Sequence, residues 1–341
     1  MKALVLTRAL QLELRQRDIP VPEKDEVIIR IAVCGVCGTV HHLFQGQSGA
    51  APNPFPIILG HEFSGVVAGT GPEVKNIKEG DRVCVDPNCT CGQCEECLRG
   101  RPHFCRSMVC YGTTTDGGFA EYCKVREKAV YRLPDSVSFE EGAMVEPVAC
   151  CLHGMDRCGL KPGETVAIIG CGPIGQIMVQ LAKRSGADRI IVIEPIQKRR
   201  EMALAFGADL AFDPTRVDIK RALSDEKVQG PDHVIECVGQ KSTMSMAIEL
   251  TGRGGTAMLF GLTAPEDEIS IRPFDLFQRE ISVLTSYINP YTTQRVINLI
   301  AARKISLLPL ITHRVPIDQA IDVFTKPANG DRGKVLIMMG H

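Results

Sequence analysis

Apolar and polar positions follow one rule in the first part of this 341-residue chain and another rule after residue 147. In the first part the apolar runs are short, as in "EVIIRIAVCGVCG" and "FSGVVAGTG", and stretches such as "GPEVKNIKEGDRV" separate them. Short runs rich in β-branched residues between Gly, Pro and charged residues are typical of strands and turns. We therefore predict a β-rich domain over residues 1–147. Near its end, Ser138 and Glu141 have the spacing of a capping box and predict the start of a helix.

From Val166 onward the pattern becomes strand, glycine turn and helix. The run "VAIIG" is continuously apolar, as expected for a parallel strand covered on both faces. The next segment carries an apolar helical stripe made of Ile174, Ile177, Met178, Leu181 and Ala182. Five more short apolar runs follow, from "RIIVIE" to "ISVLTSY". Strands that alternate with helices predict an α/β fold with a doubly wound parallel sheet over residues 148–288.

The last 53 residues, 289–341, combine helical and strand patterns. The segment "TTQRVINLIAARK" predicts a helix, and Ile317, Ala320, Ile321 and Phe324 form the stripe of a second one. The chain closes on "GKVLIM", which predicts a strand. We expect this segment to return to the first domain, so that the parallel-sheet domain is an insertion.

Composition narrows the classes of partner. The formal charge is −1, with 39 Lys and Arg against 40 Asp and Glu, and gives no general attraction to nucleic acid or acidic membranes. The sequence has no apolar stretch near the ~20 residues that span a bilayer and no signal peptide, so we expect a cytoplasmic protein. Its 15 cysteines favour metal binding or catalysis in such a compartment.

The turn "GCGPIG" places Gly170, Gly172 and Gly175 in GxGxxG spacing between a strand and a helix. Such a turn lets a dinucleotide pyrophosphate approach the backbone and the positive end of the helix. Glu194 ends the next strand, where an acid can bind the ribose hydroxyls and repel a 2′-phosphate. NAD is therefore the predicted cofactor. Lys198, Arg199 and Arg200 leave NADP open, and a glycine turn without a ligand is the remaining alternative.

Four cysteines, Cys91, Cys94, Cys97 and Cys105, lie on one short polar segment within about residues 86–110. Four thiolates at this spacing suit a closed tetrahedral zinc that folds the loop. An iron–sulfur cluster and four unligated thiols are the alternatives. Cys89 and Cys110 fall outside the spacing.

Two further motifs, "CGVCGTVHH" and "GHEFSGVVAGTG", complete a pattern that resembles the zinc-containing alcohol dehydrogenases of the medium-chain dehydrogenase/reductase family. The resemblance runs through the whole chain and implies a Rossmann domain inserted in a GroES-like catalytic domain. Glu146 in "MVEPVA" makes the sequence most similar to the sorbitol/polyol and threonine dehydrogenase branch. The resemblance implies a catalytic zinc held by Cys37 and His61, with Glu62 and Glu146 completing the sphere directly or through water.

The resemblance also implies a reaction, namely oxidation of a secondary alcohol or polyol by hydride transfer to the nicotinamide. Thr39 and His42 match the hydroxyl and imidazole of the family's proton relay, and Glu62 is a further candidate for the catalytic set. Homo-tetramers or homo-dimers are expected. The implied cofactor contacts are Gly170, Gly172, Pro173, Ile174, Gly175, Glu194, Arg199, Phe260, Gly261, Leu262, Thr285 and Ser286.

The chain departs from the family pattern at two positions. Val40 stands where the family usually carries an aspartate that helps to orient the zinc-bound histidine, and loss of such a partner typically costs ~10–100-fold in metal affinity or activity. Ser286 stands where polyol dehydrogenases carry a substrate-binding arginine. Two alternatives follow. One is an NADP-linked alcohol or carbonyl reductase with an altered or missing catalytic zinc, and the other is a non-enzymatic zinc or redox sensor.

Overall fold

The computed structural model describes residues 1–47, 54–326 and 332–340. The chain divides into two compact units, Met1–Ala149 with Pro290–His341, and Cys150–Asn289. The second unit contains the parallel sheet and interrupts the first in the sequence, so the predicted fold class is confirmed. No helix among the described residues is long and apolar enough to cross a membrane.

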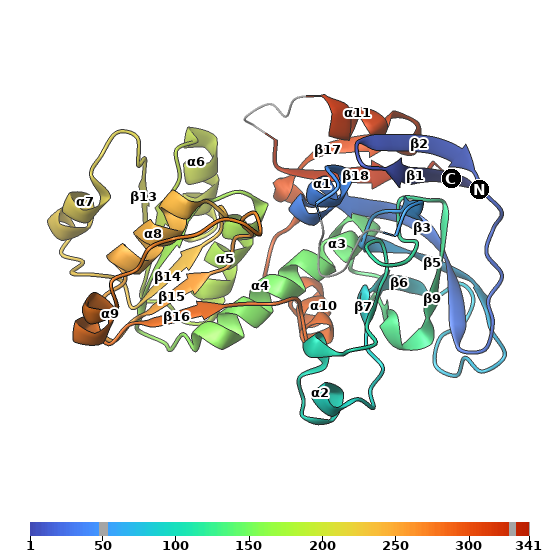
Figure 1. Ribbon diagram of the computed structural model, residues 1–341, viewed down its shortest axis with the longest axis horizontal. Coiled ribbons are helices and arrows are strands. Elements are labelled where there is room, and N and C mark those ends of the chain that lie inside the picture. The colour runs from blue at the N-terminus through green and yellow to red at the C-terminus, as the bar shows by residue number, and fades with distance from the viewer. Residues whose placement is uncertain (48–53, 327–331, 341) are drawn as a thin grey trace. The chain divides into compact units, whose positions relative to one another are not determined.

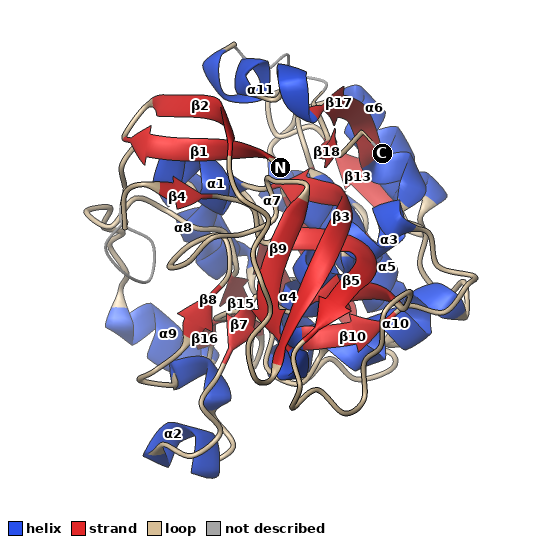
Figure 2. Cartoon of the chain, turned by 90° about the vertical axis from the view of Figure 1, so that its right-hand side faces the viewer, coloured by secondary structure: helices blue, strands red, loops and turns tan. Residues whose placement is uncertain are grey.

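The first unit is mainly antiparallel sheet (Figures 1 and 2). Its strands are β1 (Lys2–Arg8), β2 (Gln11–Gln16), β3 (Glu26–Val36), β4 (Ile57–Ile58), β5 (Glu62–Thr70), β6 (Arg82–Val85), β7 (Asn88–Cys89), β8 (Val109–Cys110), β9 (Tyr122–Arg126), β10 (Val130–Arg132), β17 (Ile311–Pro316) and β18 (Lys334–Met338). Its helices are α1 (Gly38–Phe44), α2 (Glu95–Leu98), α3 (Phe139–Ala143), α10 (Thr293–Ala301) and α11 (Ile321–Thr325), and four short 3₁₀ turns join them.

The central strand of this unit is β3, which pairs with β5, β9 and β18 (Figure 2). Most of its residues are buried, and Cys34 is fully buried. The C-terminal strand β18 lies antiparallel to β3, with Val335 opposite Val36, which confirms that the end of the chain returns to the first domain. The capping box at Ser138 and Glu141 is present at the start of α3.

The predicted helix around Ile317–Phe324 is interrupted. A 3₁₀ turn covers Ile317–Gln319, and α11 begins only at Ile321. The apolar stripe was therefore a correct guide to burial, since Ile317, Ala320 and Phe324 all pack into the core of this unit. It was wrong about the continuity of the helix, because the 3₁₀ turn changes the hydrogen-bonding period.

The second unit is a six-stranded parallel sheet with the order β13-β12-β11-β14-β15-β16 (Figure 1). Helix α4 (Val145–Cys158) leads into it. The strands are β11 (Thr165–Ile169), β12 (Arg189–Ile193), β13 (Leu210–Phe212), β14 (His233–Glu236), β15 (Thr256–Leu259) and β16 (Ser282–Thr285). The helices are α5 (Pro173–Arg184), α6 (Gln197–Ala205), α7 (Ile219–Asp225), α8 (Lys241–Leu250) and α9 (Pro273–Arg279).

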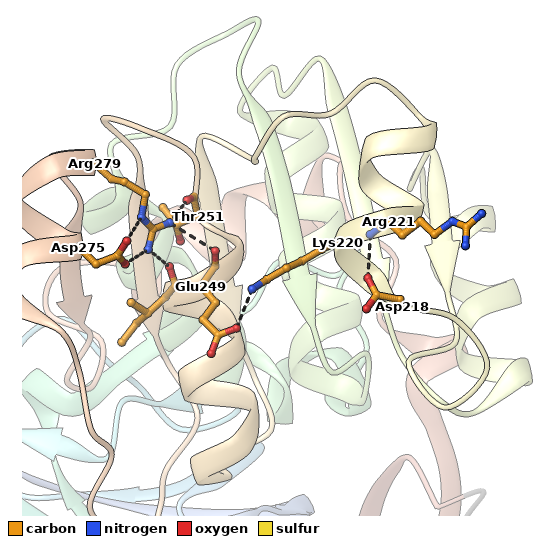
Figure 3. Close-up of polar contacts among 8 residues, drawn as sticks. Asp218, Lys220, Arg221, Glu249, Thr251, Asp275 and Arg279 are labelled. Carbon is orange, nitrogen blue, oxygen red and sulfur yellow. Dashed lines mark hydrogen bonds and ion pairs between the residues drawn. The ribbon is translucent and has the colours of Figure 1, made fainter.

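The strand order reverses direction between β11 and β14, and ligands of such sheets bind outside the carboxyl ends of the strands at this point. Polar contacts join helices α7, α8 and α9 of this unit to one another (Figure 3). The Arg279 guanidinium of α9 donates to the Asp275 carboxylate at 2.6 Å and to the Thr251 carbonyl, just after α8, at 2.8 Å. Lys220 of α7 reaches Glu249 of α8 at 3.0 Å.

Candidate active site

Three side chains at the adjoining ends of β3 and β5 form one cluster. The strands β3 and β5 pair so that Gly35 lies opposite Glu62, which brings Cys37, two residues beyond Gly35, close to His61. The ligand atoms of Cys37, His61 and Glu62 all lie within 4.8 Å of one another. Cys37 Sγ is 3.1 Å from His61 Nε2. A thiol, an imidazole and a carboxylate are ligands that zinc takes in catalytic sites, so this cluster fits the metal.

His61 is positioned by a glycine-rich loop packed against the residue before it. Gly60 has a φ of +95°, and its carbonyl accepts the backbone N–H of Gly118 at 2.7 Å. A Cβ on Gly112 or Gly117 would lie 2.1 or 2.2 Å from the Gly60 oxygen. The close backbone contact therefore requires glycine at both loop positions, and it holds the chain that leads into His61.

A residue that the sequence analysis missed, Lys334, completes the cluster. It begins β18, is only 5% exposed, and donates from Nζ to Glu62 Oε2. Glu62 is only 1% exposed, so the two charges form a buried ion pair. A Cβ on Gly35 would lie 2.1 Å from Glu62 Oε2, so the glycine makes room for the pair. A Lys at the start of an apolar strand gave no sequence signal of this role.

Burial and the charges in the cluster shift the pKa values of Lys334 and Cys37. Burial by itself lowers the pKa of Lys334, but the carboxylate of Glu62, followed by Cys37 and Glu146, outweighs it and leaves that pKa above its ordinary value. Burial and the nearby Glu62 carboxylate raise the pKa of Cys37 to about 11. Lys334 therefore stays charged, and the Cys37 thiol releases its proton when a metal ion replaces it.

Glu146 does not join the group that Cys37, His61 and Glu62 form within 4.8 Å. It lies in the first turn of α4, and its carboxylate is near enough to Lys334 to raise the pKa of that residue. The structure thus brings together three of the four ligands that the resemblance implied for this site. The fourth stays at the edge of the cluster.

The two candidate relay residues lie on α1, which Cys37 caps at its N-terminus. Thr39 and His42 are three positions apart and so share one side of the helix. The Thr39 side chain interacts with the Cys37 thiol, and His42 Nδ1 is hydrogen-bonded to Gln47 Oε1. Val40, between them in sequence, is fully buried.

The four cysteines of the loop also come together, with all four sulfurs within 4.8 Å of one another. Backbone N–H groups point at two of the thiols: that of Cys94 donates to Cys91 Sγ at 3.3 Å, and that of Cys91 donates to Cys105 Sγ at 3.2 Å. Backbone donors at Cys97 and Arg106 lower the pKa of Cys94 to about 6. Such donors stabilise thiolates, so this second cluster fits a closed zinc site.

In the second unit, the glycine turn after β11 has the geometry that a dinucleotide requires. Gly170 has a φ of +83°, and a Cβ on Gly175 would lie 2.0 Å from its carbonyl oxygen. Gly172 caps α5 and Pro173 opens that 12-residue helix, with Ile174 next. Any side chain at Gly175 would break the contact between turn and helix, so the residues present fit a pyrophosphate at this helix start.

Glu194 follows β12 at the same edge and is buried at 2% exposure. Its carboxylate accepts the backbone N–H of Cys171 at 2.7 Å and that of Ile196 at 3.0 Å. The guanidinium of Arg199 lies 3.9 Å from this carboxylate. The acid is therefore fixed beside the glycine turn, with one arginine next to it.

The other predicted cofactor contacts lie at the ends of β15 and β16. Phe260, Gly261 and Leu262 follow β15, and Leu262 is exposed. Thr285 ends β16, and its carbonyl accepts a hydrogen bond from Arg157. Within the described part of the chain, the buried hydroxyl of Ser286 has no hydrogen-bond partner.

A second residue missed by the sequence analysis, Glu236, organises this edge. It ends β14, is fully buried, and its Oε1 accepts the backbone N–H groups of Val238 and Gly239, both at 2.8 Å. A Cβ on Gly261 would lie 2.5 Å from Glu236 Oε2. Glu236 thus fixes the spacing between the segments that follow β14 and β15. Its place at the end of a buried strand was the available signal.

Comparison with known proteins agrees with both units. Residues 23–135 match the alcohol dehydrogenase GroES-like domain, and residues 173–302 match the zinc-binding dehydrogenase domain. The chain is 32% identical over 341 residues to D-arabinitol dehydrogenase 1 of Uromyces fabae, which covers 99% of this chain and 97% of that protein. It is 33% identical over 340 residues to the sorbitol dehydrogenase of Gallus gallus, with 98% and 95% covered. The chain belongs to the zinc-type medium-chain alcohol dehydrogenases, in their polyol branch.

Solved structures of this family have the same fold. A zinc-binding dehydrogenase from Sinorhizobium meliloti 1021 bound to NADP has a TM-score of 0.95 at 38% identity, with 99% of each chain covered. Galactitol-1-phosphate dehydrogenase from Escherichia coli has a TM-score of 0.90 at 29% identity, covering 99% of this chain and 100% of that one. The predictions of family, fold class and oxidoreductase activity on an alcohol are confirmed, and this dehydrogenase is an enzyme rather than a sensor.

Proposed function

We propose that this protein oxidises a secondary alcohol of a polyol with NAD, using a zinc ion held by Cys37 and His61. The observation that carries the proposal is the cluster of Cys37, His61 and Glu62, since three ligands of these types with one partly exposed member suit a catalytic zinc. When bound, zinc lowers the pKa of an alcohol hydroxyl, and a nicotinamide accepts hydride. The names of the relatives, arabinitol and sorbitol dehydrogenases, support a polyol as substrate.

The chain's own residues would bind and move the proton. His42 Nδ1 donates to the Gln47 side-chain oxygen, which leaves Nε2 as the nitrogen that can accept a proton. Thr39, on the same side of α1, supplies a hydroxyl that can pass a proton toward it. Lys334 pairs with Glu62 beside Cys37 and His61, and this contact fixes the position of the carboxylate in the cluster.

NAD is the preferred cofactor in this proposal because Glu194 is fixed at the ribose end of the glycine turn. Its carboxylate would repel a 2′-phosphate and accept hydrogen bonds from ribose hydroxyls. NADP is the second candidate, since Arg199 lies beside Glu194 and the S. meliloti relative was crystallised with NADP. Replacement Glu194→Ala should therefore raise the Kd of NADH several-fold more than that of NADPH, as measured by fluorescence titration. An unchanged ratio contradicts the preference for NAD.

The four-cysteine loop is proposed as the second zinc site, with a structural role. Metal analysis of the purified protein should then find about two zinc ions per chain. Cytoplasmic location and an assembly of two or four copies stay predictions.

The substrate class is tested by a screen of sugar alcohols, diols, polyol phosphates and threonine, each with NAD and with NADP. We expect the fastest turnover with a polyol and NAD. Ser286 stands where polyol dehydrogenases carry a substrate-binding arginine, so polyols whose recognition needs a cation at that position should be poor substrates. Turnover of threonine alone would contradict the polyol proposal.

A further inference from the structure

The second ring nitrogen of His61 lacks the hydrogen bond that a zinc ligand normally makes. His61 is only 7% exposed, and its Nε2 faces Cys37 Sγ. Its Nδ1 is buried and has no hydrogen-bond partner within residues 1–47, 54–326 and 332–340. Buried polar atoms in proteins are nearly always paired, and a metal-bound histidine almost always donates its other N–H to a carboxylate, a carbonyl or water. The missing partner therefore bears directly on metal binding.

The position of the imidazole proton links the missing hydrogen bond to metal binding. A ring nitrogen that binds a cation carries no proton, so binding through Nε2 puts the proton on Nδ1. In this protein that N–H would be buried without an acceptor, which is unfavourable. The other tautomer, with Nε2–H directed at the Cys37 sulfur, avoids the buried donor. When Nε2 binds metal, the surroundings of His61 thus leave the Nδ1–H without support.

The carboxylate of Glu62, next to His61 in sequence, is paired with Lys334. Val40 is fully buried, its side chain cannot accept a hydrogen bond, and its backbone N–H points at the Cys37 thiol. The four-cysteine loop differs in this respect, because backbone N–H groups already point at its sulfurs.

We infer that His61 binds zinc without a hydrogen-bond acceptor for its Nδ1–H. This lowers the zinc affinity of the Cys37 and His61 site about 10- to 100-fold relative to a site whose histidine has such an acceptor. The zinc of this site is then exchangeable under chelator concentrations that leave the four-cysteine zinc in place. The inference rests on the proposed function only in taking zinc as the metal at Cys37 and His61.

The test uses the full chain loaded with zinc, and the four-cysteine site serves as reference in the same molecule. Zinc affinity and release rate at each site are measured by competition with a chromogenic chelator, for the wild type, Val40→Asp, Val40→Asn and the apolar control Val40→Leu. We expect the Asp and Asn variants to retain the Cys37 zinc 10- to 100-fold better, and the Leu variant to match the wild type. The four-cysteine zinc should be the same in all four proteins.

A measurement on the wild type keeps the inference testable if the Asp and Asn variants do not fold. In nitrogen-labelled, zinc-loaded protein, the Nδ1–H of His61 should exchange quickly and lack the downfield proton shift of a hydrogen-bonded imidazole. A slowly exchanging, strongly downfield signal would overturn the inference, as would folded variants whose zinc affinity equals that of the wild type. If the Cys37 site takes no zinc in any of the proteins, the proposed function fails as well. Equal zinc affinities in all four proteins would overturn the inference and leave the proposed function in place.

Discussion

The two candidate zinc clusters of the first unit are built in opposite ways. The cysteines at 91, 94, 97 and 105 come from one loop, and backbone N–H groups of the same loop point at their sulfurs. The cluster of Cys37, His61 and Glu62 forms where β3 ends and β5 begins, and Lys334 of β18 pairs with its carboxylate. A local cluster can fold the loop that carries it, whereas an assembled cluster exists only once the sheet has formed. The first suits a structural metal and the second suits a reactive one.

The largest effect should come from Cys37→Ala. Removing the thiolate from the assembled cluster should lower kcat/KM by at least about 1000-fold, because a Lewis acid supplies several kcal/mol of transition-state stabilisation. Zinc content should fall from about two to about one per chain, while the Kd of NADH stays within about twofold of the wild type. Steady-state kinetics, metal analysis and fluorescence titration measure the three quantities. A variant with normal turnover would remove this cluster from the mechanism.

Next in size is Lys334→Met, which leaves the buried carboxylate of Glu62 without its partner. We expect the free energy of unfolding of the metal-free protein to fall by roughly 3–5 kcal/mol, the usual result of breaking a buried pair. The double variant Lys334→Met with Glu62→Gln should regain most of this loss, because it no longer buries an unpaired charge. Denaturant titrations of the three proteins give the values. Equal stability of the single variant and the wild type would show that the pair is not buried in solution.

A smaller effect on stability is expected from Cys97→Ser in the local cluster. The loop should lose its zinc and become sensitive to proteases between residues 86 and 110, with a loss of up to about 3 kcal/mol in unfolding free energy. The Cys37 zinc should remain, which limited proteolysis combined with metal analysis can show. The matched control is Cys110→Ser, at a cysteine outside the cluster of four, and it should keep both zinc ions. Loss of both ions on Cys97→Ser would mean that the two clusters are not independent.

The smallest effect is expected when substitutions of two buried residues, Glu236 and His233 at opposite ends of β14, are compared. Glu236→Gln changes the group that fixes the turn at Val238 and Gly239, and we expect the Kd of NADH to rise by roughly tenfold, about 1.4 kcal/mol. His233→Gln, at the amino end of the same strand, removes the pairing with Glu164 and should lower stability without changing that Kd. Both proteins are compared by thermal unfolding and by fluorescence titration. Equal changes in NADH affinity would assign Glu236 a purely structural role.

The sequence alone determined most of what depends on local spacing, although it missed the break in the helix around Ile317–Phe324. The glycine turn, the six strands, the capping box and the four-cysteine loop could all be recognised because each needs only residues a few positions apart. Val40 could also be recognised as a departure with an expected cost for zinc binding, although the burial of His61 Nδ1 could not. Sequence spacing says which residues are of the right type, but it does not say what lies opposite them.

Only the tertiary structure decided which distant residues form ion pairs and hydrogen bonds with one another. Lys334 reaches Glu62 because β18 and β5 both pair with β3, a fact of sheet order that no local pattern contains. His61 Nδ1 is buried without a partner in the part of the chain that the structure describes, and no local pattern shows this either. Local physics fixes spacing and periodicity, whereas burial and pairing are properties of the assembled core and follow only from how its strands are placed together.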